Sequence, residues 1–531
     1  MSNPAPLRPA AARYDQAVGW ACFAVLIVYG LLIDLKGVTN DEAARLYMMN
    51  GGLGYGLNAP AAYSSWKGVM AALNPYAYQP LYYLLQNTVM TVAHSHNVIL
   101  LRLVNLFFLW VGLRGLLALS TAWRLAPRLF LLGAFSLNAY LIMHVLQLRE
   151  YMLGIAFYIW STWLVLRLDA SKADPASVRL PWFIAYGLLL AAGFYVQTWA
   201  VLPAVGQFLF LVLSRRGWNW RFFAKLAVSY AVVLACTVPY LRSHPQRVFI
   251  GRWGTEGTAL WPQLYAGFHV VVSGSEPGVS GFTDFLFWLW LLLIASVAAL
   301  LAHNKLTQGT PVPVAELGRQ ARLMGLCTVV AVAFQIGYFY KTDDLSVSVR
   351  YFAIHYFFLT WLVVLAFKGL HDLACDGAGS QRLRRGLKFA VAAVLTVLVG
   401  SCGWQVRTFY RNPYYDMDMP RTPDWPRLMA GLSRVLEPND TVLTRNFIHA
   451  TAVNFTRPIA NPVVSIQDLP AGAPPATGRF LYLETALVIP ARPTLVAQLK
   501  SLGFATMRDA PFPAADGQGE IPGWRILIFT R

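Results

Sequence analysis

Residues 19–42 read GWACFAVLIVYGLLIDLKGVTNDE, an apolar run that gives way to charged side chains. The run Gly19–Ile33 carries no charge and has the character of a segment that crosses a bilayer. The acidic pair Asp41-Glu42 follows this run and would therefore lie where the membrane meets water. A carboxylate at that interface can accept a proton from a substrate hydroxyl. The stretch thus predicts a membrane protein with a candidate catalytic acid on one face.

The whole chain has the composition of a protein that crosses the membrane many times. Of its 531 residues, 57% are hydrophobic and 13% are charged, against about 25% charged residues in soluble domains. We expect an α-helical polytopic membrane protein with about 11 to 13 transmembrane helices. Eleven segments have the required length and low charge: 17–35, 99–121, 128–147, 150–167, 181–199, 200–214, 222–241, 283–302, 322–340, 351–369 and 388–404.

The net charge of +18 reflects basic loops between these segments, and no basic surface segment with interleaved aromatic residues indicates nucleic-acid binding. Loops rich in Lys and Arg stay in the cytoplasm. Eleven crossings with a cytoplasmic N-terminus place all the basic loops there, namely 122–128, 167–180, 215–225, 303–322 and 368–388. The same count places the segment 36–98 and everything after residue 404 outside the cytoplasm.

Two further segments, the N-terminal apolar run and residues 79–94, determine this topology. Arg8 and Arg13 precede the first apolar run as in a signal sequence, but no small-residue cleavage site follows, so we expect a retained helix. Residues 79–94 are apolar but short and carry Gln86 and Asn87. We predict an interfacial or re-entrant helix there, which makes 36–98 an outer loop with interfacial helices.

The last part of the chain, from residue 405 on, has a different character. Charged residues, Pro and Asp become more frequent, and apolar residues follow an α/β pattern. We therefore divide the chain into a transmembrane catalytic domain, 1–404, and a small C-terminal α/β extracytoplasmic domain, 405–531. The pattern predicts helices at 424–436 and 493–501, strands at 441–445, 480–484 and 524–530, and a loop at 468–478.

The pair Asp41-Glu42 has two interpretations. Thr39 or Asn40 can cap a helix that ends before Gly51, with both acids stabilised by the helix dipole. The same acids can act as a base toward an acceptor hydroxyl. Spacing alone slightly favours the helix cap, and the two interpretations are compatible.

Further candidate binding residues lie in the first outer loop. Gln79, Tyr82 and Tyr83 belong to a stretch rich in Pro and Tyr, which would also serve as a plain aromatic belt at the membrane surface. Arg102 follows near the outer start of its helix. Charges at such depth usually serve a substrate or a pathway, although arginines also extend toward the interface without a ligand.

Two other outer turns carry charge. Arg149 and Glu150 form a short turn between two apolar segments. Residues 341–351 include Lys341 and the pair Arg350-Tyr351, and Arg binds phosphate oxygens in a bidentate way.

The acids Asp343 and Asp344 are the one candidate for a divalent metal, which prefers oxygen ligands, although adjacent acids in a loop are more often simply solvated. No other cofactor is indicated. The sequence has no Walker A loop, GxSxG or HExxH, and its five scattered cysteines include no CxxC, so neither a zinc site nor a disulfide framework is predicted.

Several short motifs follow one another in order along most of the chain. They are Asp41-Glu42-Ala43, Gln79-Pro80-Leu81-Tyr82-Tyr83, Leu101-Arg102-Leu103, Gln147-Leu148-Arg149-Glu150-Tyr151, Tyr195-Val196-Gln197-Thr198, Arg350-Tyr351, and the opening of the last domain from Pro423 to Leu443. This ordered set resembles the GT-C superfamily of glycosyltransferases. These polytopic enzymes take a sugar from a polyprenyl-phosphate carrier, and they include protein O-mannosyltransferases and lipid A aminoarabinose transferases.

The resemblance implies a membrane glycosyltransferase that acts on the extracytoplasmic face, in the inner membrane of a bacterium. Asp41 would be the general base and Glu42 a weaker candidate. Arg102 and Arg350 would neutralise the departing phosphate, the outer-loop tyrosines would pack against sugar or lipid, and the transfer would invert the anomeric centre. The implied partners are a polyprenyl-phosphate sugar donor, a lipid, glycan or protein acceptor, and membrane lipids.

The chain departs from the family pattern at two places. Gln79 stands where members often have His or Lys, and the usual His near Gln197-Thr198 is absent. A cation for the donor phosphate must then come from Arg102, Lys341 or Arg350. A transporter or flippase of lipid-linked saccharides is the alternative, although no paired broken-helix repeat supports it. A non-catalytic assembly protein on the same scaffold is a third.

Overall fold

The computed structural model describes the chain in several stretches. It leaves out residues 1–8, 34–39, 51–63, 75–77, 96, 171–178, 215–219, 244–259, 309–311, 343–351, 377–380, 412–424, 445–460, 462, 466–478, 486–495, 498–499, 501–505, 514–519 and 531. The helix predicted at 493–501 and the loop at 468–478 thus lie largely or wholly outside the described residues.

Most of the described chain is helical. The helices are α1 (Pro9–Leu32), α2 (Asn40–Met49), α3 (Trp66–Leu73), α4 (Pro80–Ala93), α5 (Val98–Leu119), α6 (Leu125–Ser136), α7 (Ala139–Leu146), α8 (Tyr151–Ala170), α9 (Leu180–Val196), η2 (Thr198–Ala200), α10 (Val201–Leu213), α11 (Trp220–Ser243), α12 (Leu260–Ser273), α13 (Gly281–Gln308), α14 (Val312–Thr342), α15 (Ala353–Asp376), α16 (Gln381–Arg411) and α17 (Trp425–Leu432).

Among the described residues, seven helices are long and apolar enough to cross a membrane: α1, α5, α8, α11, α14, α15 and α16. The bent pair α6–α7 makes an eighth if it counts as one broken span, and α9, α10 and the described part of α13 are shorter apolar helices. Each of the eleven expected segments therefore coincides with a helix or a helix pair. The polytopic helical fold is confirmed.

The bundle carries its apolar side chains outside as well as inside. Trp20 and Leu31 of α1 and Phe389 and Val399 of α16 are each more than 60% exposed, whereas α8 and α15 are mostly buried. An apolar exterior of this extent is a liability in water but suits a lipid environment. The helices are therefore arranged as a membrane bundle around α8 and α15.

The segment 128–147 is two helices and not the single span that the sequence predicted. Helices α6 and α7 meet at an angle of 59°. Asn138 causes the break because its Oδ1 accepts the backbone N–H of Tyr140 at 2.9 Å and so caps α7. Its Nδ2 donates to the carbonyl oxygen of Val271 at 3.2 Å. The N–H of Tyr140 at the bend thus has a partner, as a backbone group needs inside a membrane bundle.

The long apolar stretch 181–214 is divided, as expected, into α9 and α10. The break lies at Gln197, whose backbone is extended (φ −149°, ψ 127°), close to the expected boundary between 181–199 and 200–214. The short helix η2 follows it directly. This break becomes part of the site described below.

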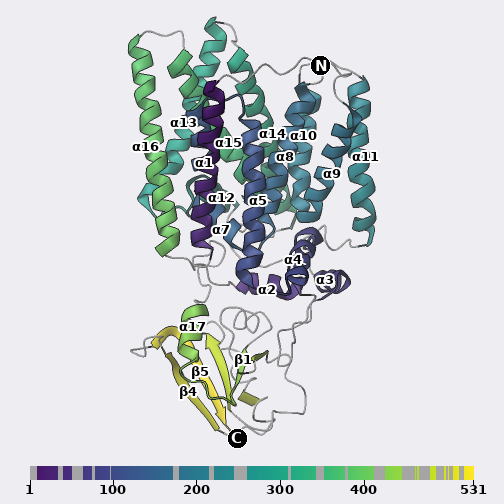
Figure 1. The fold of residues 1–531 in the computed structure, drawn as a ribbon, viewed down its shortest axis with the longest axis vertical. Helices are drawn as coiled ribbons and strands as arrows, with labels where there is room; N and C mark the ends of the chain where they lie inside the picture. Colours follow the sequence, from purple (N-terminus) through teal and green to yellow (C-terminus); the bar gives the residue numbers. More distant parts are fainter. Residues whose placement is uncertain are drawn as a thin grey trace.

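Helices α2, α3 and α4 lie at the end of the bundle that faces the C-terminal sheet, and α1 begins at the opposite end (Figure 1). α4 has 14 residues and is therefore about 21 Å long, shorter than the roughly 30 Å of a bilayer core. It is a separate short helix, as predicted for residues 79–94. Its interfacial placement stays a prediction.

The C-terminal part contains α17 and a five-stranded mixed sheet of order β2-β1-β3-β5-β4. The strands are β1 (Thr441–Thr444), β2 (Val463–Ser465), β3 (Phe480–Thr485), β4 (Thr506–Pro513) and β5 (Glu520–Thr530). β1 pairs in parallel with β2 and β3, and β5 pairs antiparallel with β3 and β4. The predicted α/β character is confirmed. The sequence pattern missed β2 and β4.

Candidate functional site

A buried ion pair joins the first outer helix to the bundle. Glu42 of α2 is fully buried, Arg102 of α5 is 2% exposed, and Nη2 of Arg102 lies 3.1 Å from Oε1 of Glu42. Oε1 also accepts the backbone N–H of Leu148 at 3.1 Å, and Nη1 of Arg102 donates to the carbonyl oxygen of Ile33 at 3.1 Å. These contacts hold the start of α2, the end of α1 and the α7–α8 turn around one point.

The ion pair also fixes the position of Asp41 in the fold. Asp41 is the second residue of α2 and directly precedes Glu42. A carboxylate in the first turn of a helix is favoured by the helix dipole, so the predicted helix start is confirmed. The side chain of Asp41 lies outside what the structure describes, and its catalytic role stays a prediction.

A chain of hydrogen bonds continues from this point into α4. Gln86 Nε2 donates to Tyr82 Oη at 3.0 Å, and Tyr82 Oη donates to Asn105 Oδ1 at 3.1 Å. Asn105 Nδ2 in turn donates to the carbonyl oxygen of Gln147. All three side chains are fully buried. The chain therefore links α4, α5 and the turn that begins at Gln147.

The hydroxyl of Tyr82 stays protonated in this setting. Burial raises the pKa of Tyr82 well above its usual value near 10, and the negative charges of Glu150 and Glu42 add to the shift. A buried phenol next to carboxylates favours its neutral form because a third negative charge would be costly there. Tyr82 thus acts as a hydrogen-bond donor at neutral pH.

A second arginine, Arg45 of α2, contacts the other predicted tyrosine, Tyr83. Arg45 is 1% exposed and donates through Nη1 to Tyr83 Oη. Its guanidinium carbon lies 3.7 Å from the ring centroid of Tyr78, a distance at which cation and ring attract each other. Asn87 of α4 also donates to the carbonyl oxygen of Met49 at the end of α2, at 2.9 Å. Helices α2 and α4 are thereby held as one unit.

Gln79 connects this unit to the break between α9 and α10. Its Nε2 donates to Thr198 Oγ1 at 2.7 Å, and Gln197 Oε1 accepts the hydroxyl of Tyr158 at 3.1 Å. Gln79 and the pair Gln197-Thr198 are the two places where the chain departs from the GT-C pattern. In the structure Gln79 and Thr198, one residue from each of these two places, are hydrogen-bonded to each other.

Arg149 and Glu150 lie in the α7–α8 turn and directly follow Leu148, whose N–H binds Glu42. Arg149 is fully buried and Glu150 is 8% exposed. The guanidinium of Arg149 lies 5.8 Å from the ring of Tyr151. Arg149 and Glu150 are at most two positions from the N–H that binds Glu42. We use the term polar layer for the buried polar side chains around the Glu42–Arg102 pair, namely Glu42, Arg45, Tyr82, Gln86, Arg102, Asn105, Arg149 and Glu150.

The remaining predicted residues cannot be placed in this layer. Lys341 lies in the last turn of α14, and its side chain is outside the described residues. Asp343, Asp344, Arg350 and Tyr351 are outside them altogether. Where the structure describes the chain, no three His, Cys, Asp or Glu side chains come together as metal ligands. The metal candidate at 343–344 is untested by this observation.

Three residues of the layer were not among the predicted candidates: Arg45, Asn105 and Gln86. Each follows a predicted residue by three or four positions on the same helix, after Glu42, Arg102 and Tyr82 respectively. Residues at this spacing share a helix face. That spacing was the signal by which the sequence could have identified them.

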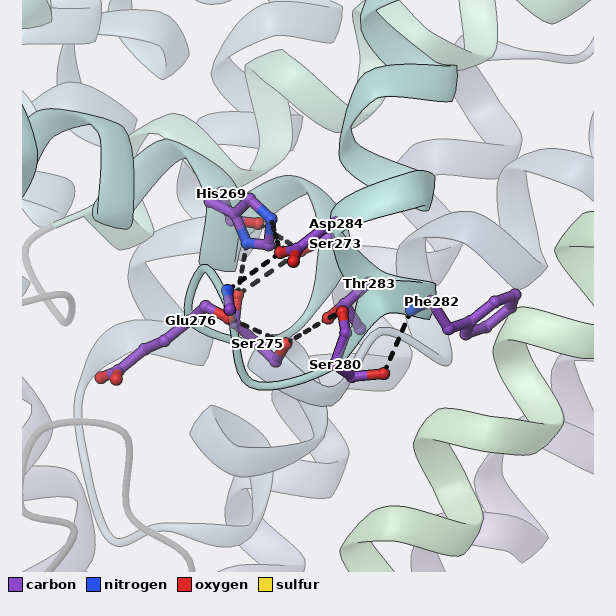
Figure 2. A network of polar contacts seen from close by, with 9 residues as sticks. His269, Ser273, Ser275, Glu276, Ser280, Phe282, Thr283 and Asp284 are labelled. Atoms are coloured by element: carbon purple, nitrogen blue, oxygen red, sulfur yellow. Dashed lines mark hydrogen bonds and ion pairs between the residues drawn. The ribbon is translucent and has the colours of Figure 1, made fainter.

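A second polar network involves residues of α12, α13 and the turn between them (Figure 2). In the turn between α12 and α13, His269 Nδ1 donates to the carbonyl oxygen of Ser275 at 2.7 Å, and its Nε2 lies 3.0 Å from Asp284 Oδ1. Ser275 Oγ donates to Thr283 Oγ1 at 2.8 Å, and the N–H of Gly278 donates to Asp284 at 3.0 Å. The turn is thus held by its own hydrogen bonds.

This turn packs closely against α16 and the start of α7. Gly274 has φ +85°, and a Cβ there would lie 2.3 Å from Gln405 Oε1, so any other residue would strain the backbone and displace Gln405. The same Oε1 accepts the backbone N–H of Ala139, the first residue of α7. The network therefore supports the helix that leads into the Gln147–Glu150 turn, and its His269, which is fully buried, has a structural role.

No protein-family model matches the sequence, and no curated protein matches it. Several solved structures, however, are similar to this chain. The crystal structure of ArnT from Cupriavidus metallidurans in the apo state is similar over 97% of this chain and 98% of that chain, with 11% identity and a TM-score of 0.54. The same protein bound to undecaprenyl phosphate gives 12% identity and a TM-score of 0.50 over the same shares.

An archaeal oligosaccharyltransferase from Archaeoglobus fulgidus is less similar, with 8% identity and a TM-score of 0.45 over 94% of this chain and 75% of that chain. The likeness to ArnT extends over nearly the whole length of both proteins, including the helical bundle and the C-terminal sheet. At such low identity it is a likeness of fold. The chain has the GT-C fold of ArnT.

Proposed function

We propose that this protein is a membrane glycosyltransferase that transfers a sugar from a polyprenyl-phosphate donor to an acceptor at the extracytoplasmic face. The observation that carries the proposal is the buried polar layer, centred on the Glu42–Arg102 ion pair, at the sheet-facing end of a bundle with the ArnT fold. Buried charges are costly in a membrane bundle and usually serve a substrate. A structure of ArnT contains undecaprenyl phosphate, which supports a lipid-linked donor here.

In this proposal Asp41 is the general base. An acceptor hydroxyl attacks the anomeric carbon of the donor sugar while its proton passes to the Asp41 carboxylate. The bond between the anomeric carbon and the phosphate oxygen breaks at the same time, and polyprenyl phosphate leaves with the bonding electron pair. Attack opposite the leaving group inverts the anomeric centre.

Charged residues have two separate roles in this proposal: positioning α2 and binding the donor phosphate. Arg102 is matched by Glu42 and bound to the carbonyl of Ile33, so we assign this pair to positioning α2 and with it Asp41. The departing phosphate then needs other cations, and Arg350 and Lys341 are the residues we propose for it. A cation at the leaving oxygen stabilises the developing charge most strongly where water is scarce.

Removal of Arg350 gives a direct test of its phosphate role. We expect Arg350→Ala to weaken binding of undecaprenyl phosphate about tenfold or more, because a charge-assisted hydrogen bond to phosphate contributes about 1.5–3 kcal/mol. The binding constant is measured by titration of the lipid into protein in nanodiscs, with the exposed Arg525→Ala as the matched control. Unchanged affinity in a folded Arg350→Ala protein would count against this role.

The proposal also fixes the orientation of the chain. We place residues 1–404 in the membrane as the catalytic domain and 405–531 outside the cytoplasm, in the inner membrane of a bacterium. In a cysteine-free background, Arg124→Cys is then expected to react with a membrane-impermeant maleimide only after the cytoplasmic side is opened. Labelling in intact spheroplasts would reverse the orientation.

Transfer is distinguished from transport by reconstitution. Purified protein in liposomes receives undecaprenyl-phosphate-linked sugars together with lipid, glycan or peptide acceptors, and products are read by mass spectrometry. Glycosylated acceptor with release of undecaprenyl phosphate supports the proposal. Movement of the lipid-linked sugar between leaflets without transfer would favour a flippase, and a lipid-linked sugar that copurifies with the protein would identify the donor.

A further inference from the structure

Glu150 carries a buried carboxylate oxygen that nothing in the described structure uses. The side chain is 8% exposed, and its Oε2 atom is fully buried without a hydrogen-bond partner among the described residues. Glu42 is the other acid of the polar layer whose side chain the structure describes. Its carboxylate pairs with Arg102 and accepts the backbone N–H of Leu148. The carboxylate of Glu42 therefore has an ion-pair partner and a hydrogen-bond donor, whereas Oε2 of Glu150 has no hydrogen-bond donor among the described residues.

An incomplete buried carboxylate is unfavourable for the protein alone. Burial of a charged oxygen without a donor costs several kcal/mol unless a partner or a ligand satisfies it. Such sites are retained mainly where function requires them, because they lower stability. The unsatisfied oxygen of Glu150 thus indicates a ligand that brings a hydrogen-bond donor.

The backbone around Glu150 is held in one position. The carbonyl of Gln147 accepts from Asn105, the N–H of Leu148 donates to Glu42, and the carbonyl of Glu150 accepts the N–H of Gly154 at 3.0 Å. Three elements of the site therefore fix the turn on which Glu150 stands. A group held this way can discriminate between ligands, since it cannot follow a ligand that lacks the matching donor.

We propose that Glu150 determines which sugar is transferred, by accepting a hydrogen bond from a hydroxyl or a protonated amine on the donor sugar. The inference rests on the proposed glycosyltransferase function and names the property that a donor must have. A sugar with hydrogen or fluorine at the position that faces Glu150 leaves Oε2 unsatisfied and binds poorly. Glu150 itself takes no part in bond making or breaking.

The test compares wild type with Glu150→Gln and Glu150→Ala, each as full-length protein in nanodiscs. The probes are undecaprenyl-phosphate pentoses that differ at one ring position at a time, with a hydroxyl, an amine, a hydrogen or a fluorine there. Binding is measured by native mass spectrometry and transfer by kcat/KM. At one ring position, wild type is expected to prefer the hydroxyl or amine by about 10- to 150-fold, the range of a hydrogen bond to a charged group.

The variants identify Glu150 as the cause of that preference. Glu150→Ala should bind all four pentoses within about threefold of each other, and a larger loss for the amine than for the hydroxyl in Glu150→Gln would identify an amino sugar as the substrate. Both variants should melt at or above the wild-type temperature, because they remove an unsatisfied carboxylate. Glu316→Gln, which alters an ion pair in α14, is the control for loss of a negative charge.

Two outcomes would overturn the inference: wild-type discrimination that persists in Glu150→Ala, or a clear loss of stability in both variants, which would make Glu150 a structural residue. Absence of transfer by wild type with undecaprenyl-phosphate pentoses and hexoses alike would contradict the proposed function instead. The binding preferences would still test Glu150 in that case.

Discussion

Asp41→Asn is expected to lower sugar transfer by about 10²- to 10⁴-fold, the usual contribution of a general base. Asn keeps the size of Asp and can still occupy the first turn of α2, but it cannot accept the proton of the acceptor hydroxyl. The loss should therefore appear in kcat, with donor affinity nearly unchanged, because the donor phosphate is bound by other residues in the proposed mechanism. The measurement is transfer from an undecaprenyl-phosphate sugar by purified protein in nanodiscs.

Asp15→Asn is the matched control for Asp41→Asn. Asp15 lies near the start of α1, at the opposite end of the bundle from α2 (Figure 1), where its exposed carboxylate pairs with the buried Arg128 at 2.6 Å. Wild-type transfer is expected from this variant. Full transfer by a correctly folded Asp41→Asn protein would remove Asp41 from the mechanism and leave the acceptor to be activated by another group.

The sequence was sufficient for the eleven long apolar segments because a membrane-spanning helix must meet a local requirement, but it did not predict the shorter helices α3 and α12. A spanning helix needs a long uncharged run, and the eleven runs were visible without any knowledge of packing. The break at Asn138 was not visible, because an asparagine within an apolar run bends a helix only if its side chain finds partners elsewhere. Here those partners are Val271 and the cap at Tyr140, and the first of these lies 133 residues away.

The candidate site was predictable as a set of residues but not as a set of pairs. Glu42, Arg102, Tyr82 and Glu150 were each recognised as polar side chains near the membrane boundary. The pairing of opposite charges depends on how α2, α5 and the α7–α8 turn pack against one another. The sequence does not show which residues of these elements face each other. The resemblance to GT-C enzymes supplied the order of motifs, while the structure showed that Arg102 is occupied by Glu42.

The ion pair between Arg102 and Glu42 leads to the second large expected effect, which is a loss of stability. Arg102→Met is expected to destabilise the protein by about 3–5 kcal/mol, because it leaves the fully buried charge of Glu42 without its partner. Met keeps much of the volume of Arg, so the effect of charge is separated from that of a cavity. The measurement is the free energy of unfolding in detergent, and Arg525→Met, which breaks an exposed pair with Asp509, should cost less than about 1 kcal/mol.

The double variant Glu42→Gln/Arg102→Met decides what the ion pair is for. If the pair only balances its own burial cost, removing both charges should recover most of the stability that Arg102→Met loses. Transfer should nevertheless stay low, since α2 would no longer be held against Leu148 and Ile33 by charged groups and Asp41 would lose its fixed position. A double variant that is stable and fully active would show that the pair does not position Asp41, and the positioning would then have to come from Arg45 and its contacts with α4.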